Sequence, residues 1–198
     1  MRRIFVAVAA LLAQPAQSQP LSAVKTAELS GALYQAGLAA DDPVLMLAAA
    51  KLRKAMVPRA ETAGTEAPLG WQEMLARAAA LADGDADLLA VIDDVAAESG
   101  KGVAAGPVYS IGNLNAGDSD SYPAVAFIGG DYAEVYVEAK VTTDLNIAVY
   151  DSKGRLVCSD TDASPIAYCG WRPGSTDSFT MTVQNDGPLG ATYALMTN

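Results

Sequence analysis

Hydrophobic residues in the first half of the chain recur every three or four positions, which is the spacing of amphipathic helices. This half, from Leu21 to about Gly106, is rich in alanine and has almost no aromatic residues. Residues typical of helix ends bound four such segments. The predicted helices run from Ser22 to Gly37, from Asp41-Asp42-Pro43 to Pro58, from about Gly70 to Ala82, and from a cap at Asp85 or Asp87 to about Val95. Paired as two helical hairpins, they would bury their leucines.

Beyond Gly106-Pro107 the pattern changes to alternation of hydrophobic and polar residues, which is typical of strands with one buried face. In one such segment Val135 and Val137 would point inward while Glu134 and Glu138 face water. Short strands separated by turn residues predict an antiparallel β-sandwich of the jelly-roll kind. The strand candidates are Val108–Ile111, Ala124–Ile128, Tyr132–Ala139, Asp144–Tyr150, Arg155–Cys158, Ile166–Trp171, Ser178–Gln184 and Ala191–Thr197.

The chain opens with the features of a secretory signal peptide. Arg2-Arg3 precede the apolar run Ile4–Ala13, and Ala16-Gln17-Ser18 offers small residues for cleavage. The apolar run is too short to cross a bilayer, so we expect a periplasmic or secreted chain without a membrane span. The predicted fold class is α+β. Its parts are a signal peptide (residues 1–18), an all-α domain of about four helices (19–105), and an antiparallel sandwich of about eight strands (106–198).

The two cysteines, Cys158 and Cys169, are predicted to form a disulfide. Export places the chain in an oxidising compartment, where a closely spaced even pair favours a bridge. The rival interpretation is a metal site, but the chain has no histidine to complete the usual zinc ligands.

The last 90 or so residues resemble a known family. The stretches that carry the resemblance are Y-A-E-V-Y-V (132–137), D-L-N-I-A-V-Y-D-S-K-G-R-L-V (144–157) and G-A-T-Y-A-L-M-T-N (190–198). They are similar to the bacterial pre-peptidase C-terminal domain. The D-T-D element (160–162), the cysteine pair with Gly170-Trp171, and the terminal Y-x-L-x-T-N (193–198) are similar, more closely, to a group of secreted proteobacterial proteins that carry this domain. Asn146 stands where the family pattern D-L-D has its second acid. The resemblance implies a small β-sandwich appended to secreted hydrolases and cell-surface proteins, and no catalysis of its own.

Charge and composition exclude several classes of function. The net charge of −10 would repel phosphate backbones, so nucleic acid is not an expected partner. Without histidine there is no Ser-His or Cys-His nucleophile pair. A hydrolase would need two carboxylates or a Ser-Lys pair. Ser22-Ala23-Val24-Lys25 has the spacing of such a pair, but a serine there is more typical of a helix cap.

Calcium is the candidate cofactor. Asp118-Ser119-Asp120 and Asp160-Thr161-Asp162 each place two carboxylates on alternate loop residues, a spacing that lets oxygen ligands converge on a cation. Asp144 and Asp151, at the ends of one predicted strand, could add further ligands. The alternative is ordinary turn chemistry, in which aspartates accept hydrogen bonds from nearby backbone N–H groups.

Aromatic residues offer a second candidate site. Tyr132, Tyr136, Tyr150 and Trp171 could form a face of the sandwich that holds a sugar or a peptide. The alternative is cross-strand pairing or half-buried core, with Trp171 packed on the cystine.

Together these observations predict an exported, non-catalytic binding or accessory module of the cell envelope, with calcium as a candidate stabilising ion. Its expected ligand is a protein or a polysaccharide of the envelope. Two alternatives remain: a hydrolase with catalytic carboxylates in the cleft between the two parts, and a partner or inhibitor of a secreted hydrolase.

Overall fold

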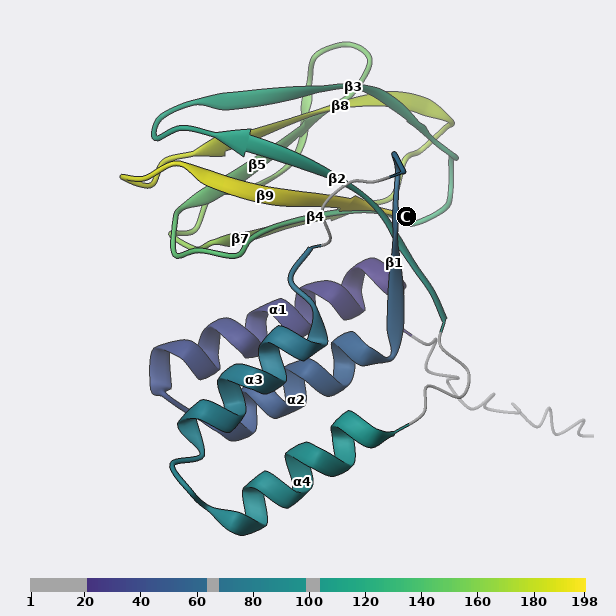
Figure 1. The fold of residues 1–198 in the computed structure, drawn as a ribbon. Coiled ribbons are helices and arrows are strands. Elements are labelled where there is room, and N and C mark those ends of the chain that lie inside the picture. The colour runs from purple at the N-terminus through teal and green to yellow at the C-terminus, as the bar shows by residue number, and fades with distance from the viewer. Residues whose placement is uncertain (1–20, 64–67, 99–103) are drawn as a thin grey trace, which may run out of the picture.

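The computed structural model describes residues 21–63, 68–98 and 104–198. The predicted signal peptide and part of the predicted domain boundary lie outside the described residues. Figure 1 shows a helical layer resting against a β-sandwich. The described residues form four helices and nine strands in two sheets, which confirms the predicted α+β class. Among the described residues, no helix is both long and apolar enough to cross a membrane.

Local capping chemistry explains where three helices begin. Helix α1 (Ala23–Ala40) is capped by Ser22, whose Oγ accepts from the backbone N of Lys25 at 2.9 Å. Asp42 caps α2 (Pro43–Lys54) and Asp85 caps α4 (Ala86–Ala97) in the same way. Helix α3 (Trp71–Leu81) starts after Gly70, whose N–H donates to the Glu73 side chain. The Ser22–Lys25 spacing is therefore a helix cap.

Helix α1 continues past the predicted stop at Gly37 and ends at Ala40. A Cβ at Gly37 would lie 2.8 Å from Cγ of Met46, so this glycine lets α2 approach α1 closely. The turn itself is made by Asp41, which has a positive φ of 48°. Gly37 serves the contact between two helices, and sequence reasoning assigned it the wrong role.

The prediction missed strand β1 (Met56–Ala60), whose first residues, up to Pro58, were assigned to the end of the second helix. Pro58 cannot continue a helix. It is tolerated here because β1 is an edge strand, where a missing N–H costs little. Strand β1 pairs parallel with β2 (Ala104–Leu114), and this is the only parallel pairing in the described sheets. A segment from the helical half thus belongs to the sandwich.

The two sheets face each other across an apolar core. One has the order β1-β2-β9-β4-β7 and the other β3-β8-β5-β6. Side chains such as Val135, Ile147 and Val183 alternate inward and fill the space between them. The remaining bounds are β3 (Ser119–Phe127), β4 (Ala133–Ala139), β5 (Leu145–Tyr150), β6 (Leu156–Asp160), β7 (Ile166–Trp171), β8 (Asp177–Asn185) and β9 (Ala191–Thr197).

The predicted disulfide is confirmed. Cys158 on β6 is bonded to Cys169 on β7, with the two Cα atoms 5.9 Å apart. Strands β6 and β7 are the last strands of their sheets, so the bond joins the two sheets along one edge of the sandwich. Such a bond is typical of proteins that work outside the reducing cytosol.

The outer face of the five-stranded sheet is covered by helix α1 (Figure 1). Val24 and Ala27 of α1 pack on Tyr136, Ala194 and Met196 of the sheet. The contact is close because α1 has Gly31 at the crossing, where a Cβ would lie 2.0 Å from the Tyr136 hydroxyl. The expectation that Glu134 and Glu138 face water is therefore wrong. Both are buried, since the layer of helices lies over the face from which they project.

A buried ion pair joins the layers at this contact. Arg53 of α2 donates from Nη1 and Nη2 to the two carboxylate oxygens of Glu138, at 2.6 and 2.8 Å, and both residues are at most 3% exposed. The other guanidinium N–H groups donate to Ser30 Oγ and to the carbonyls of Ala27 and Leu69. Burial alone would lower the pKa of Arg53, but the Glu138 carboxylate outweighs it and raises that pKa. The cation is fully paired, as a buried charge requires.

Glu138→Gln should lower the free energy of unfolding by about 3–5 kcal/mol, because it leaves the Arg53 cation buried without its counter-ion. Urea denaturation followed by circular dichroism measures this. Lys51→Gln is the matched control, since it breaks the exposed pair with Glu98, where a loss of about 0–1 kcal/mol is expected. Equal effects of the two variants would contradict the role of the buried pair.

Replacing both cysteines by serine should lower the free energy of unfolding by about 3 kcal/mol, the value for a closed loop of roughly 12 residues. Thermal melts with and without reductant measure it. Reductant should destabilise the wild type by the same amount and leave the double variant unchanged. A wild-type melt that does not move when both thiols are shown to be free would contradict the prediction.

Candidate functional site

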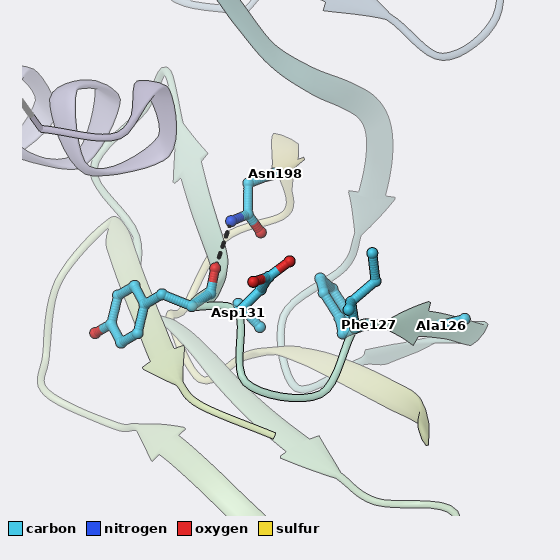
Figure 2. Close-up of a pocket in the computed structure, with 7 residues that line it drawn as sticks. Ala126, Phe127, Asp131 and Asn198 are labelled. Carbon is cyan, nitrogen blue, oxygen red and sulfur yellow. Dashed lines mark hydrogen bonds between the residues drawn. The ribbon is translucent and has the colours of Figure 1, made fainter. Parts of the chain in front are cut away.

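A hollow lies at the end of the sandwich where β3 turns into β4 (Figure 2). Its volume is about 230 Å³. Figure 2 shows Asp131 and Asn198 on one side of it and Phe127 on the other. We call this space the β3–β4 hollow, and it is lined by Ala126, Phe127, Ile128, Asp131, Tyr132, Ala133 and Asn198.

Asn198 connects the hollow to the first residues of β4. Its Nδ2 donates to the carbonyl of Tyr132 at 2.7 Å, and its Oδ1 accepts from the backbone N of Glu134 at 3.0 Å. The side-chain amide therefore satisfies two backbone groups at the point where strand pairing begins. This contact holds the backbone of Tyr132 in place.

The side chain of Tyr132 is fixed by a second set of contacts. It is 47% exposed, yet a Cβ at Gly170 would lie 2.3 Å from its hydroxyl and 2.7 Å from that of Tyr168. Gly170 is the cross-strand partner of Glu134, so its missing side chain leaves room for both hydroxyls on the outer face of the sheet. We call the exposed ring of Tyr132, seated over Gly170, the Tyr132 platform.

Beneath the platform lies a buried carboxylate. Tyr168 donates from its hydroxyl to Oε1 of Glu134 at 2.8 Å, and Glu134 is 2% exposed. The pKa of Tyr168 is raised above its ordinary value, first by burial and then by its hydrogen bonds with Glu134 and Tyr132. The phenol thus stays protonated and remains a donor to the carboxylate. Oε2 of Glu134 has no hydrogen-bond partner among the described residues.

Two cations flank the tyrosine pair. The guanidinium of Arg172 lies 6.0 Å from the Tyr132 ring centroid and donates to the carbonyl of Gly130. The ammonium of Lys25 lies 4.2 Å from the Tyr168 ring centroid and pairs with Glu28 at 2.7 Å. Cations at these distances are attracted to ring faces and restrict their movement. The platform therefore has an apolar ring face, with a cationic donor in Arg172 and a carboxylate acceptor in Glu134 nearby.

The structure does not bring the four predicted aromatic residues together on one face. Tyr132 is exposed, and Tyr150 is half-buried on the other sheet. Tyr136 is fully buried under α1, where its hydroxyl donates to Glu138. Trp171 lies in the sandwich core with its ring centroid 5.0 Å from that of Phe127. Only Tyr132 therefore combines exposure with fixed geometry.

The six predicted calcium ligands are distributed over several places. Asp118 accepts from Asn115, and Asp120 accepts from the hydroxyl of Tyr193. Asp151 closes the β5–β6 turn, where hydrogen bonds from the backbone and side chain of Arg155 lower its pKa. These three aspartates act within turns or beside core residues.

Asp144, Asp160 and Asp162 lie nearer one another. A hydrogen bond with Asp160 is the first cause of the raised pKa of Asp162, and Asp144 adds to it. Oδ1 of Asp144 and Oδ1 of Asn146 are buried without hydrogen-bond partners, whereas calcium takes six to eight oxygen ligands. Across residues 21–63, 68–98 and 104–198, no three acidic or cysteine side chains are grouped so as to hold a metal ion. Calcium binding stays a prediction from the sequence.

The cleft between the helices and the sandwich was the predicted place of a carboxylate pair. A cavity of about 360 Å³ lies there, lined by residues of β1, α3 and their neighbours, and Arg53 is the one charged residue among the described residues of its lining. All five N–H groups of Arg53 are already bonded. A smaller space of about 40 Å³ reaches Glu138, whose carboxylate is held by Arg53. Neither space offers two free carboxylates.

Sequence reasoning singled out Tyr132 but missed the residues that position it. Tyr168, Gly170 and Glu134 are close only because β4 and β7 pair in one register. The available signal was a glycine in the middle of a predicted strand, which often marks the close approach of another group.

No family model matches the chain, and no curated protein sequence matches it either. Several solved structures are similar to part of it. One is the pre-peptidase C-terminal domain of a collagenase from Bacillus anthracis, at 13% identity and a TM-score of 0.39, covering 46% of this chain and 89% of that one.

Two further structures are similar over nearly the same share of the chain. PliG, a periplasmic inhibitor of g-type lysozyme from Aeromonas hydrophila, matches at 9% identity and a TM-score of 0.33, covering 46% of this chain and 84% of that one. The C-terminal CBM6 module of LamC from Zobellia galactanivorans matches at 12% and 0.28, covering 43% and 79%. Scores this low give the chain neither a family nor a ligand.

Glu134→Gln should lower the pKa of Tyr168 towards the ordinary value of about 10, because a neutral amide no longer opposes the phenolate. NMR of tyrosines labelled with ¹³C at the ring carbon bearing oxygen follows the titration. Between about pH 8 and 12 the wild-type Tyr168 signal should not move, whereas in the variant it should begin to shift. Asp120→Asn, next to Tyr193, is the control. An unchanged Tyr168 titration in Glu134→Gln would contradict the hydrogen bond.

Proposed function

We propose that this protein is an exported, non-catalytic binding module of the cell envelope, periplasmic or secreted, and that its ligand is an uncharged polysaccharide held at the Tyr132 platform. Its place in the group of secreted proteobacterial proteins with a pre-peptidase C-terminal domain is part of the same proposal. The observation that carries it is that Tyr132 is 47% exposed although its hydroxyl and backbone are both anchored.

An anchored aromatic ring on a surface is suited to binding. Its apolar face can cover the C–H face of a sugar ring. Because Gly170, Tyr168 and Arg172 already restrict the ring, little side-chain entropy is lost when a ligand is bound. Because the entropic cost of fixing the ring on binding is small, the arrangement supports a binding role.

The polar groups around the ring favour an uncharged, hydroxyl-rich ligand. Asp131 and Asn198 line the adjacent hollow and Arg172 lies beside the ring. Carboxylate, amide and guanidinium groups together offer acceptors and donors for sugar hydroxyls. An acidic polymer would be repelled by a chain whose net charge is −10.

The surroundings of the cleft and of the Tyr132 platform give less support to the two alternatives, a hydrolase and a partner or inhibitor of a hydrolase. A carboxylate-dependent hydrolase needs two free acids facing a cleft, whereas among the described residues the acids near the cleft are Glu138, which is paired with Arg53, and Glu73, which caps α3. A partner or inhibitor of a secreted hydrolase would dock through a larger apolar surface than Tyr132 and Ile128 provide at the β3–β4 hollow. Such a partner is an outcome of the test below.

Tyr132→Ala should abolish binding to short uncharged oligosaccharides, because stacking on the ring is the main apolar contact. The mature protein is applied to an array of uncharged and acidic glycans. Tyr150→Ala is the matched control, since it removes a half-buried tyrosine from the other sheet, and it should retain wild-type binding.

Three outcomes would contradict the proposal. They are no retention of the wild type by any uncharged glycan, equal retention of Tyr132→Ala and wild type, and loss of binding to a purified secreted hydrolase in Tyr132→Ala without any effect on glycans. The last would favour the partner function. Folding of each variant is checked by its thermal melt.

A further inference from the structure

The cavity between the helical layer and the edge of the five-stranded sheet has no part in the function proposed above. In Figure 1 strand β1 runs from the end of α2 to the sandwich, and the cavity lies between this strand and the start of α3. We call it the β1–α3 cavity. Its volume is about 360 Å³, whereas ligand pockets usually hold about 300–1,000 Å³ and often lie where two structural units meet. Its size and position are therefore those of a ligand pocket.

The lining of the β1–α3 cavity is apolar. Met56, Leu69 and Tyr109 are buried side chains that line it, and the half-buried Trp71 adds an indole ring. Arg53 also lines the cavity, but its guanidinium N–H groups are all bonded elsewhere, and its methylene stem is apolar. The cavity thus offers apolar contacts to a ligand and no buried charge that a ligand would have to pair.

The cavity is open to solvent beside β1. Val57 belongs to its lining and is 59% exposed. Strand β1 is the last strand of its sheet, so no further strand of the described sheets covers this edge. A ligand can therefore enter the cavity beside the edge strand.

The charge around the cavity differs from that of the whole chain. The net charge of the chain is −10, yet the segment from Lys51 to Arg59, which supplies several of the lining residues, has four cations and no acid. Two of these cations are paired with acids. Lys54 and Arg59 have no carboxylate partner among the described residues. The segment therefore keeps an uncompensated positive charge.

Lys54 brings part of this charge to the cavity. Its ammonium lies 4.3 Å from the centroid of the Trp71 ring, which lines the cavity. Two of its N–H groups donate to the carbonyls of Val95 and Ala96 at the end of α4, at 2.6 and 2.9 Å. An ammonium has three donors, so one remains, and the partial negative charge of a helix end offsets only part of the cation. The side of the cavity at Trp71 therefore suits an anionic group.

We propose that the β1–α3 cavity binds one fatty acid with a chain of medium length, whose tail fills the cavity and whose carboxylate pairs with Lys54. A volume of about 360 Å³ is roughly twelve times the share of a water molecule in the liquid, which is room for about a dozen non-hydrogen atoms, the size of decanoate. A neutral apolar molecule would leave the ammonium without a counter-ion, and a cationic amphiphile would be repelled by it.

This site is separate from the Tyr132 platform. The residues of the β3–β4 hollow beside the platform and the described residues of the cavity lining have no member in common. The two sites also take ligands of different chemistry, since one covers a sugar ring with an aromatic face and the other encloses an acyl chain. Either proposal can therefore fail without the other.

Isothermal titration calorimetry of the mature protein with straight-chain fatty acids, below the concentrations at which they form micelles, tests the proposal. Decanoate should bind with a stoichiometry of one. From butanoate to decanoate the affinity should rise about fourfold for each added methylene, because each is removed from water. The rise should stop at chains of about ten carbons, because the cavity is then full.

The variant Lys54→Met keeps an apolar stem of similar length and removes the charge. Its affinity for decanoate should fall about tenfold, whereas its affinity for decanol should not change. Lys51→Met is the matched control, since it removes a cation that lies three residues earlier in α2 and is already paired with Glu98. It should bind both molecules like the wild type.

A second pair of variants tests the entrance of the cavity and changes only exposed residues. Val57→Glu places a carboxylate in the lining, where it should repel that of decanoate and weaken binding about tenfold. Val44→Glu is its control, because Val44 is 58% exposed and lies at the other end of α2. It should leave the affinity unchanged. Thermal melts check that each variant is folded.

Four results would overturn the proposal. They are a wild type that shows no saturable binding of decanoate, equal affinities of Lys54→Met and wild type for decanoate, tighter binding of decyltrimethylammonium than of decanoate, and an affinity that continues to rise with chain length beyond the size of the cavity. Tyr132→Ala should bind decanoate like the wild type and lose only the glycans, so the failure of one proposal is distinguished from the failure of the other.

Discussion

The close contact between helix α1 and the outer face of the five-stranded sheet determines how this molecule is built. A glycine at the crossing lets the helix lie against Tyr136, and the Arg53–Glu138 pair closes the same contact from α2. With every N–H group of the guanidinium bonded, the buried charges have one arrangement that satisfies them. This contact covers one sheet with helices and leaves the end of the sandwich and the opposite sheet uncovered by them.

Features set by neighbouring residues were predictable from the sequence. Ser22, Asp42 and Asp85 cap helices because their side chains reach N–H groups two or three residues ahead. The alternation in β4 and β5 predicted the inward residues correctly. The close spacing of the two cysteines, together with the predicted signal peptide, indicated the disulfide.

Features that depend on what packs on a surface were not predictable. The alternation that placed Val135 inward also placed Glu134 and Glu138 outward, and nothing local indicates that a helix covers them. Strand β1 was missed because its pairing with β2 joins residues about fifty positions apart. The support of Tyr132 required the cross-strand register of Glu134 and Gly170, which one sequence does not reveal.

Strand β1 also has a bearing on how such a sandwich can be inherited. The strand at the edge next to β2 comes from a segment between α2 and α3. Recombination that transferred the sandwich without this segment would therefore transfer an incomplete sheet. A gene fusion that carried only the last hundred residues would leave β2 as a bare edge, ready to pair with other chains. The helices and the sandwich are therefore expected to be inherited as one unit.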